Sequence, residues 1–190
     1  TGGVAAVHAR GRSRDAIFDA LERRETYGTS GPRILLWFNT VDGTPMGGTV
    51  RTDKGPVFEV KAVGAYKQKP GCPEDTLDLL GVERVQKLCA NECYNPSDER
   101  LRITRIEIVR IRPQITPDER VDGLIDDPWM VHKCPADGEG CSFTFSDPAF
   151  AEGERMATYY ARAIQEPTER INADNLRCTY DAEGNCLKVN

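Results

Sequence analysis

The polar residues that follow the first predicted helix could bind an anion. Thr29, Ser30 and Gly31 come after an amphipathic segment and before an apolar strand. Hydroxyl groups and successive backbone N–H groups can together hold a phosphate. An ordinary helix-to-strand connection explains the same residues more simply, and binding would also need a substrate placed nearby by another domain. We therefore keep these three residues as weak candidates for ligand binding.

Two groups of acidic residues could bind calcium, but each also fits a turn. Residues 181–185 place oxygen ligands at alternate positions, as at the start of a calcium-binding loop. Gly184 falls at the fourth position rather than the sixth, and no acidic residue closes the loop, so a hairpin turn is favoured. Asp126, Asp127 and Asp147 form the second group, in which the Asp-Pro pairs are typical of turns.

Five arginines in one predicted strand could bind phosphate or nucleic acid. They are Arg100, Arg102, Arg105, Arg110 and Arg112. Because Glu99 and Glu107 are close and the net charge is −5, a solvated, salt-bridged sheet face is favoured. With 25 basic and 30 acidic residues, the chain lacks the basic excess of nucleic-acid-binding proteins, so we expect no nucleic-acid partner.

The histidines are too few for a multi-histidine metal centre, because the chain has only His8 and His132. His132 and Cys134 could form a metal site or a nucleophilic pair, but nothing supplies a third ligand or an orienting group. We expect no catalytic residue and no metal ligand here, so the chain should fold without a cofactor and should not hydrolyse phosphate esters. The large aromatic residues are interpreted as core residues between two sheets, namely Trp37, Trp129 and Tyr160.

Seven cysteines indicate disulfides formed in an oxidising compartment. None has the C-x-x-C spacing of zinc or redox motifs. Asp137 and Gly138 predict a two-residue hairpin turn that places Cys134 directly opposite Cys141, at a separation that a disulfide tolerates. We therefore predict a bond between Cys134 and Cys141.

A second bond is predicted between Cys178 and Cys186, which flank another turn-rich stretch. The register decides its geometry, because a three-residue loop leaves the two cysteines diagonal and a five-residue loop places them opposite each other. Cys72, Cys89 and Cys93 remain, and three thiols cannot all pair internally. One of them is therefore free or pairs with a cysteine outside this chain.

The elements that must position these residues begin with a β-α unit. Residues 3–8 predict a buried strand, Ser13 an N-cap and residues 14–25 a helix. The apolar stripe of this helix is Ile17, Phe18 and Leu21. Residues 1–32 therefore have the organisation of the last strand and helix of an α/β domain.

Strands dominate the rest of the chain, residues 33–190, and predict an antiparallel β-sandwich with a helical insertion at about 73–90. The protein is thus mainly β, and α+β overall. A shift in apolar phase predicts a β-bulge near Thr104 and Arg105. The expected strands are 34–38, 49–52, 56–66, 101–112, 129–133, 141–145 and 156–165. No apolar run approaches the roughly 20 residues of a transmembrane helix, so we expect no membrane partner.

Several phrases together resemble the C-terminal third of a large bacterial family known only as a domain of unknown function. The phrases are residues 2–7, 13–21, 25–34, 127–129 and 159–167. That family is distantly similar to the polymerase and histidinol phosphatase (PHP) superfamily of metal-dependent phosphoesterases. The resemblance implies that a distorted α/β barrel with a divalent-metal site precedes this segment. The chain contains no His-x-His and no Asp-x-His motif, so no metal ligand of the family maps onto it.

The resemblance also implies a partner, a location and a role. The partner would be the N-terminal barrel of the same protein, and the location would be periplasmic or secreted, in agreement with the cysteines. Many members carry an aromatic residue near the position of His8, where this chain departs from the family. The absence of an initial Met and the abrupt end at Asn190 suggest a fragment. Its expected role is a non-catalytic sandwich that supports the barrel and its substrate entrance. The alternative is an independent binding module for a glycan, a protein or a cell-surface component.

Overall fold

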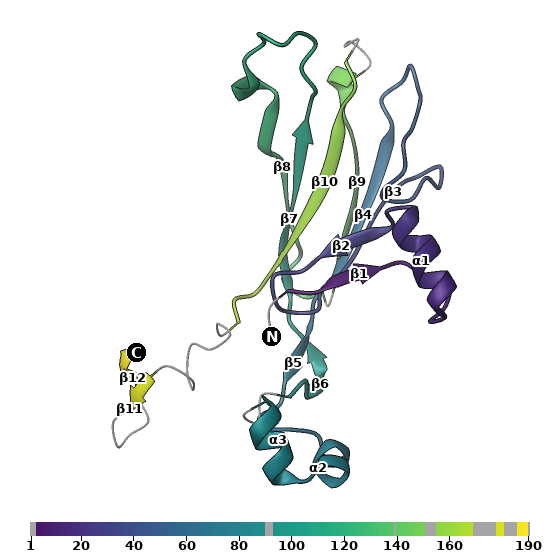
Figure 1. Cartoon of the computed structure of the whole chain (residues 1–190). Coiled ribbons are helices and arrows are strands. Elements are labelled where there is room, and N and C mark those ends of the chain that lie inside the picture. The colour runs from purple at the N-terminus through teal and green to yellow at the C-terminus, as the bar shows by residue number, and fades with distance from the viewer. Residues whose placement is uncertain are drawn as a thin grey trace.

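The computed structural model describes residues 3–88, 93–138, 140–150 and 155–168 in full, and the backbone of 89, 178–180 and 186–189. The fold is mainly β with a few short helices, as predicted, and its sheets are antiparallel (Figure 1). Two three-stranded sheets form the body. One has the order β3-β4-β9, from Leu35–Thr40, Val57–Val63 and Gly140–Ser146; the other has the order β10-β7-β8, from Thr158–Gln165, Ile103–Ile111 and Ile125–Lys133.

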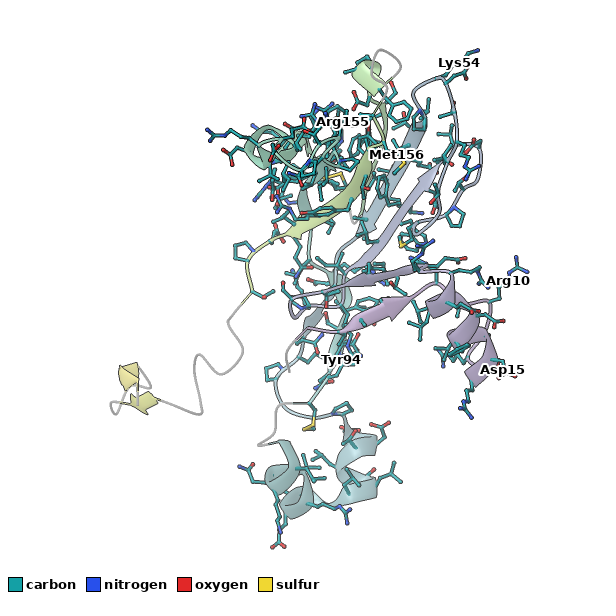
Figure 2. All side chains as sticks on the ribbon, turned by 45° about the horizontal axis from the view of Figure 1, so that its top comes forward. Arg10, Asp15, Lys54, Tyr94, Arg155 and Met156 are labelled. Atoms are coloured by element: carbon teal, nitrogen blue, oxygen red, sulfur yellow. A yellow bond between two sulfur atoms is a disulfide. The ribbon has the colours of Figure 1, made fainter. Side chains whose placement is uncertain are left out.

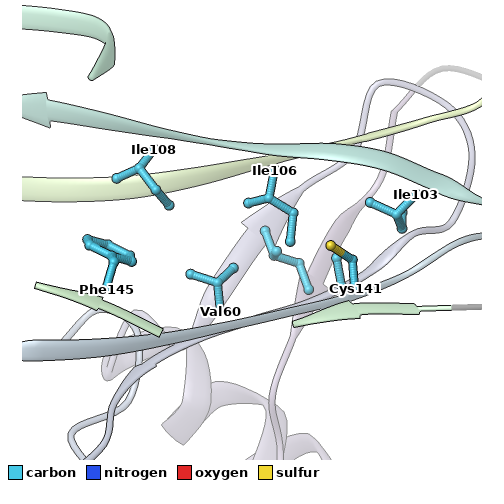
Figure 3. Close-up of a cluster of buried hydrophobic side chains, with 8 residues drawn as sticks. Val60, Ile103, Ile106, Ile108, Cys141 and Phe145 are labelled. Atoms are coloured by element: carbon cyan, nitrogen blue, oxygen red, sulfur yellow. The ribbon is translucent and has the colours of Figure 1, made fainter. Parts of the chain in front are cut away.

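The hydrophobic core lies between these two sheets (Figure 3). Val60 and Phe145 come from one sheet and face Ile106 and Ile108 of the other. Strand alternation explains the pattern, because every second side chain of β4 points inward. Phe58, Val60 and Ala62 therefore share the inward face of β4. Burial of each large aliphatic side chain contributes about 1.5 to 3 kcal/mol to stability.

The predicted β-bulge is present at Thr104. β10 pairs with β7 in one register up to Ile164 opposite Arg105, and Gln165 then pairs with Ile103, so Thr104 has no partner in the ladder. The Thr104 hydroxyl instead donates to the Ile164 carbonyl at 2.9 Å. The strand predicted at 156–165 is also present and runs from Thr158 to Gln165.

The strand predicted at 56–66 is divided, because β4 ends at Val63 and a new strand begins at Tyr66. A Cβ at Gly64 would lie 1.6 Å from the Leu101 carbonyl oxygen, so only glycine permits this close approach. β5 (Tyr66–Gln68) and β6 (Pro96–Arg100) form a ribbon that carries α2 (Glu74–Leu80) and α3 (Val82–Cys89), the predicted helical insertion. The strand predicted at 49–52 is wrong: this segment is a connection in which the Thr52 hydroxyl organises a turn with Lys54.

The hairpin predicted between the strands that flank residues 134–141 is also wrong. β8 pairs with β7 and β9 pairs with β4, so the chain passes from one sheet to the other at this point. The disulfide between Cys134 and Cys141 is nevertheless present, with their Cα atoms 5.6 Å apart. It therefore joins the two sheets rather than two paired strands. A local turn signal cannot distinguish the two arrangements, because both bring the ends of the strands together.

The N-terminal unit consists of β1 (Ala5–Val7), α1 (Arg14–Glu22) and β2 (Thr26–Gly28). The Ser13 hydroxyl caps α1 by accepting from the Ala16 N–H at 3.2 Å, as predicted. The helix is shorter than predicted, since Arg24 adopts a left-handed conformation with φ of 61° and redirects the chain. β1 pairs antiparallel with β2, a strand that the sequence analysis missed.

The last two strands lie outside both large sheets, so the sandwich does not extend to residue 190 as predicted. β11 (Cys178–Tyr180) and β12 (Cys186–Val189) form a two-stranded sheet of their own. The register pairs Tyr180 with Cys186 and Cys178 with Val189, so Cys178 and Cys186 are not opposite each other. Their side chains lie outside the described residues, and the Cys178–Cys186 bond stays a prediction.

Candidate functional site

The predicted loop at Thr29, Ser30 and Gly31 borders a cleft of about 650 Å³. Thr29 and Ser30 line this cleft, together with Tyr27, Gly28 and Pro32, while residues 161–168 of β10 and its extension form the other wall. Ile34 and Leu36 of the facing sheet complete the lining with Glu107. We call this feature the β10 cleft.

The backbone N–H and the hydroxyl group of Thr29 form hydrogen bonds within the fold. Its N–H donates to the Val4 carbonyl at 2.9 Å, and its hydroxyl oxygen accepts from the Val4 N–H at 3.3 Å. These two bonds extend the pairing of β1 and β2 by one residue. The arrangement is that of the ordinary connection considered above. Among the described residues, Ser30 and Gly31 form no comparable hydrogen bond.

The wall formed by β10 carries a charged group on its outer side. The Arg162 guanidinium forms ion pairs with Glu107 at 2.9 Å and with Asp127. The hydrogen bond that Arg162 donates to Asp127, followed by the charges of both carboxylates, raises the pKa of Arg162. Glu107 also accepts from Arg105 at 2.7 Å. The positive charge in the cleft is therefore already neutralised by protein carboxylates.

Polar side chains also hold the C-terminal end of β10. Glu166 accepts from the Arg102 N–H and from the Arg102 guanidinium, both at 3.2 Å, and these hydrogen bonds lower the pKa of Glu166. Gln165 accepts from the Ala65 N–H at 3.0 Å through its amide oxygen, while its amide nitrogen is buried without a hydrogen-bond partner. The end of β10 is thus held by Arg102, just before β7, and by Ala65, between β4 and β5.

A second cleft, lined by aromatic residues and about 490 Å³ in volume, opens between β3 and β10. Tyr27, Leu36 and Ala161 line both clefts. The Tyr27 hydroxyl donates to the Ile34 carbonyl at 3.0 Å, and burial raises the pKa of this phenol. The other aromatic residues of the second cleft are Phe38, Phe58, Phe150, Tyr159 and Tyr160.

An ionic cluster lies at the opposite end of the sandwich, near Arg155 and Met156 in Figure 2. Asp147, which is 2 % exposed, accepts from Arg110 at 2.7 Å and from the Tyr159 hydroxyl at 2.8 Å. Arg110 also donates to Asp126 at 2.9 Å and lies 4.9 Å from the centre of the Trp129 ring. The cluster therefore connects the end of β9 with β7, β8 and β10.

The electrostatics of this cluster favour a permanent ion pair. Burial opposes ionisation of Asp147, but the hydrogen bonds from Arg110 and Tyr159 outweigh it, so the pKa of this carboxyl lies below its ordinary value. Burial, followed by the bond to Asp147, raises the pKa of Tyr159. The pKa of Arg110 is also raised: burial opposes its charge, and its two carboxylate partners more than compensate. Such a group of satisfied charges is suited to structure rather than to proton transfer.

The acidic residues considered for calcium do not converge on a cation site. Asp126 and Asp147 both bind Arg110, whereas Asp127 pairs with Arg162 on the outer face. Residues 181–185 lie outside the described residues. Where the structure describes the chain, no group of three or more His, Cys, Asp or Glu residues is placed to hold a metal ion.

The remaining candidates have structural contacts. His132 stacks on Phe143 at 4.2 Å, and Cys134 is in its disulfide, which agrees with the interpretation that these two residues form no metal site or nucleophilic pair. His8 donates from Nε2 to the Leu36 carbonyl at 2.8 Å. Four of the five arginines form salt bridges, as predicted, namely Arg102, Arg105, Arg110 and Arg112. Arg100 instead lies over the Tyr66 ring.

The expectation for the large aromatic residues holds in part. Trp129 packs against the core, but Tyr160 is 39 % exposed on the outer face of β10. Trp37 lies beside Lys61 and His8 rather than in the core cluster. Successive side chains of a strand point to opposite faces, so an error of one residue moves a side chain from the core to the surface. Composition alone could not place Tyr160 on the correct face.

Two disulfides indicate that the protein folds in an oxidising environment. Besides the bond at residues 134–141, the structure joins Cys72 to Cys93 at the base of the helical insertion. Among the described helices none is long and apolar enough to span a membrane.

Sequence reasoning missed most of the groups that form the two clefts and the ionic cluster. Arg162, Glu166 and Tyr159 were not candidates, because their partners are distant in sequence. One sequence pattern could have indicated that this strand lies at a sheet edge. Ala161, Arg162 and Ala163 alternate small and charged residues on opposite faces, which is typical of an edge strand.

Comparisons with known proteins find one family. Residues 1–41 match the family described as "Protein of unknown function (DUF3604)". The match covers the N-terminal unit and β3, the first strand of the sandwich. No significant similarity to a curated protein or to a solved structure was found.

Proposed function

We propose that this chain is a non-catalytic β-sandwich module of an exported, periplasmic or secreted protein, and that it supports a preceding PHP-like barrel of a metal-dependent hydrolase. The observation that carries the proposal is the apolar face of α1. Ile17, Phe18 and Leu21 are 37 %, 63 % and 49 % exposed. An isolated helix of nine residues with this face in water needs a hydrophobic neighbour to be stable.

The neighbour is not supplied by the described part of this chain. Only Ala20 of α1 is buried, and the helix projects from the side of the molecule, where Asp15 marks its first turn (Figure 2). Burial of a side chain such as Phe18 or Leu21 contributes about 1.5 to 3 kcal/mol. A domain placed against α1 would thus be held by several kcal/mol of apolar contact. The family match at residues 1–41 includes this helix.

The test compares the full-length protein with this chain by hydrogen exchange. We expect the amides of α1 to exchange more slowly in the full-length protein, because the barrel would cover the helix. The double variant F18D/L21D should remove this protection. The matched control is Leu79→Asp, which places the same charge at a residue of α2 that is 82 % exposed. Equal exchange of α1 in both proteins would contradict the proposal.

A second candidate function is an independent binding module, and a different feature favours it. The β10 cleft combines an open strand edge with apolar and hydroxyl-bearing walls, which are the properties of a recognition site rather than of a domain contact.

A further inference from the structure

β10 has one edge that pairs with β7 and one that pairs with nothing in the described chain. Its neighbours in the sheet are β7 on one side only, and its last extended residue, Glu166, donates to the Arg102 carbonyl on that same side. A free strand edge presents backbone N–H and C=O groups at alternate residues. β10 is eight residues long, so it offers about four such residues to a partner.

Two of the other three edge strands, β3 and β8, carry features that hinder pairing, whereas the outer edge of β9 is also unpaired in the described chain. The outer edge of β3 is capped, since His8 donates to the Leu36 carbonyl and the Thr40 N–H donates to the Thr44 carbonyl at 2.9 Å. The edge strand β8 contains Pro128, which has no N–H to donate. β10 has neither device, and proline appears only beyond its end, at position 167.

The β10 cleft runs along this free edge and has room for a strand. Its volume of about 650 Å³ is within the usual range for binding pockets. Residues 161–168 form one wall, and residues 27–30 with Pro32 form the wall opposite. Since the second wall stands in front of the edge, a complete sheet of another copy of this chain is too wide to enter. A single extended segment is the occupant that fits.

We propose that the free edge of β10 binds an extended peptide segment of a partner protein by β-strand addition. Backbone hydrogen bonds would supply the affinity, and alternate side chains of the peptide would supply the selectivity. Inward-facing peptide side chains meet Ile34, Leu36 and the small residues Ala161 and Ala163, so they are apolar. Outward-facing side chains lie beside Arg162, whose charge is already neutralised, so they are polar and uncharged.

The experiment selects from a phage-displayed library of random linear peptides about ten residues long, with this chain as target. We expect selected peptides to alternate apolar and uncharged polar residues and to lack proline at their centre. N-methylation of a selected peptide should weaken binding by about tenfold at every second position and little at the positions between them. When a selected peptide is bound, NMR spectra should show slower amide hydrogen exchange at alternate residues of β10 than in the free protein.

Matched glycine variants locate the binding to the cleft. A Cβ at Gly28 meets nothing within 4 Å, so Gly28→Trp should fill the cleft without backbone clash and weaken binding by about tenfold or more. Gly11→Trp adds the same side chain at an equally open position outside the cleft and should leave binding unchanged.

Three outcomes would overturn the proposal. The first is that no peptide is enriched, and the second is that enriched peptides bind the wild type and Gly28→Trp equally. The third is a set of N-methylation effects without alternation, which would indicate a bound conformation other than a strand. If Gly28→Trp does not fold, the N-methylation series and the exchange pattern of β10 decide the question without it. The α1 variants F18D/L21D leave this edge intact, so failure here is distinct from failure of the proposed domain contact.

Discussion

The most specific prediction of the structure concerns Asp147, which lies just beyond β9 and binds groups from the other sheet. Its side chain accepts from Arg110 at 2.7 Å, from the Tyr159 hydroxyl at 2.8 Å and from the Ala149 N–H at 3.0 Å. Asp147→Asn keeps the shape of the side chain and removes its charge. An amide has only one accepting oxygen, so its NH2 group faces either the Ala149 N–H or the donors Arg110 and Tyr159, and the variant tests the ion pair with little change in packing.

The expected loss of stability follows from the geometry. Two unit charges about 4 Å apart attract each other by about 4 kcal/mol at the effective dielectric constant near a protein surface. Part of this is recovered, because the variant no longer desolvates a carboxylate and Arg110 keeps its bond to Asp126. We therefore expect the free energy of unfolding to fall by about 2 to 3 kcal/mol, near the lower end of the range for breaking a buried pair. The exposed pair Lys67–Glu99 supplies the control, and Glu99→Gln should lower the free energy of unfolding much less than Asp147→Asn does, because solvent screens an exposed pair.

The pH dependence gives a second, independent readout. Because the pKa of Asp147 is lower in the folded state than in the unfolded chain, its ion pair stabilises the fold at pH values above the ordinary carboxyl range. That contribution is lost as the pH falls through the folded pKa, so the difference between wild type and Asp147→Asn should shrink below about pH 4. Urea unfolding followed by circular dichroism at pH 7 and pH 3, with disulfides intact, measures both quantities. Equal losses in Asp147→Asn and Glu99→Gln, or a difference that stays constant with pH, would refute this reasoning.

Three further outcomes are expected. Replacing both Cys134 and Cys141 by alanine should lower the free energy of unfolding by about 2 to 3 kcal/mol in urea, since the bond closes a short loop; an unchanged midpoint would contradict this. Gly64→Ala should cost about 2 kcal/mol or more by the same assay, because its Cβ would collide with the Leu101 carbonyl, whereas Gly123→Ala, with nothing within 4 Å, should be within about 0.5 kcal/mol of wild type. Elemental analysis should find no stoichiometric transition metal, and turnover of an aryl phosphate with added zinc, manganese or magnesium should equal the buffer rate; turnover that needs His8 or His132 would overturn that expectation.

The features that sequence predicted correctly depend on neighbours along the chain. The N-cap at Ser13 is set by a bond to Ala16, only three residues away. The bulge at Thr104 is visible because the apolar phase of one strand must slip by a residue there. The bond between Cys134 and Cys141 was predicted from a hairpin whose two strands prove to lie in different sheets. It is present because the short connection between the cysteines brings them together whichever strands flank it.

The features that sequence could not predict depend on which strands become neighbours. β8 and β9 follow each other in the chain, yet they belong to opposite sheets, because each finds a partner far away in sequence. The pairing of Arg162 with Glu107 and Asp127 and the convergence on Arg110 depend on the same choice. Single-sequence patterns specify which face of a strand is apolar, but not which strand lies beside it. The candidate site was therefore recognised only at Thr29 and Ser30, and its wall on β10 was missed.

The placement of the strongest cross-connections gives the two sides of the sandwich different properties. β9 is fastened to the opposite sheet at both ends, by the disulfide of Cys141 at its start and by the ion pair of Asp147 just past its end. On the other side, β3 and β10 are joined by no such bond in the described residues, and both clefts open between them. A ligand that needs a strand edge to be accessible can therefore enter on the side of β10 without breaking a cross-connection. The core stays covered by Phe145, Ile106 and their neighbours although the β10 edge is unpaired, so the fold does not depend on a partner at that edge.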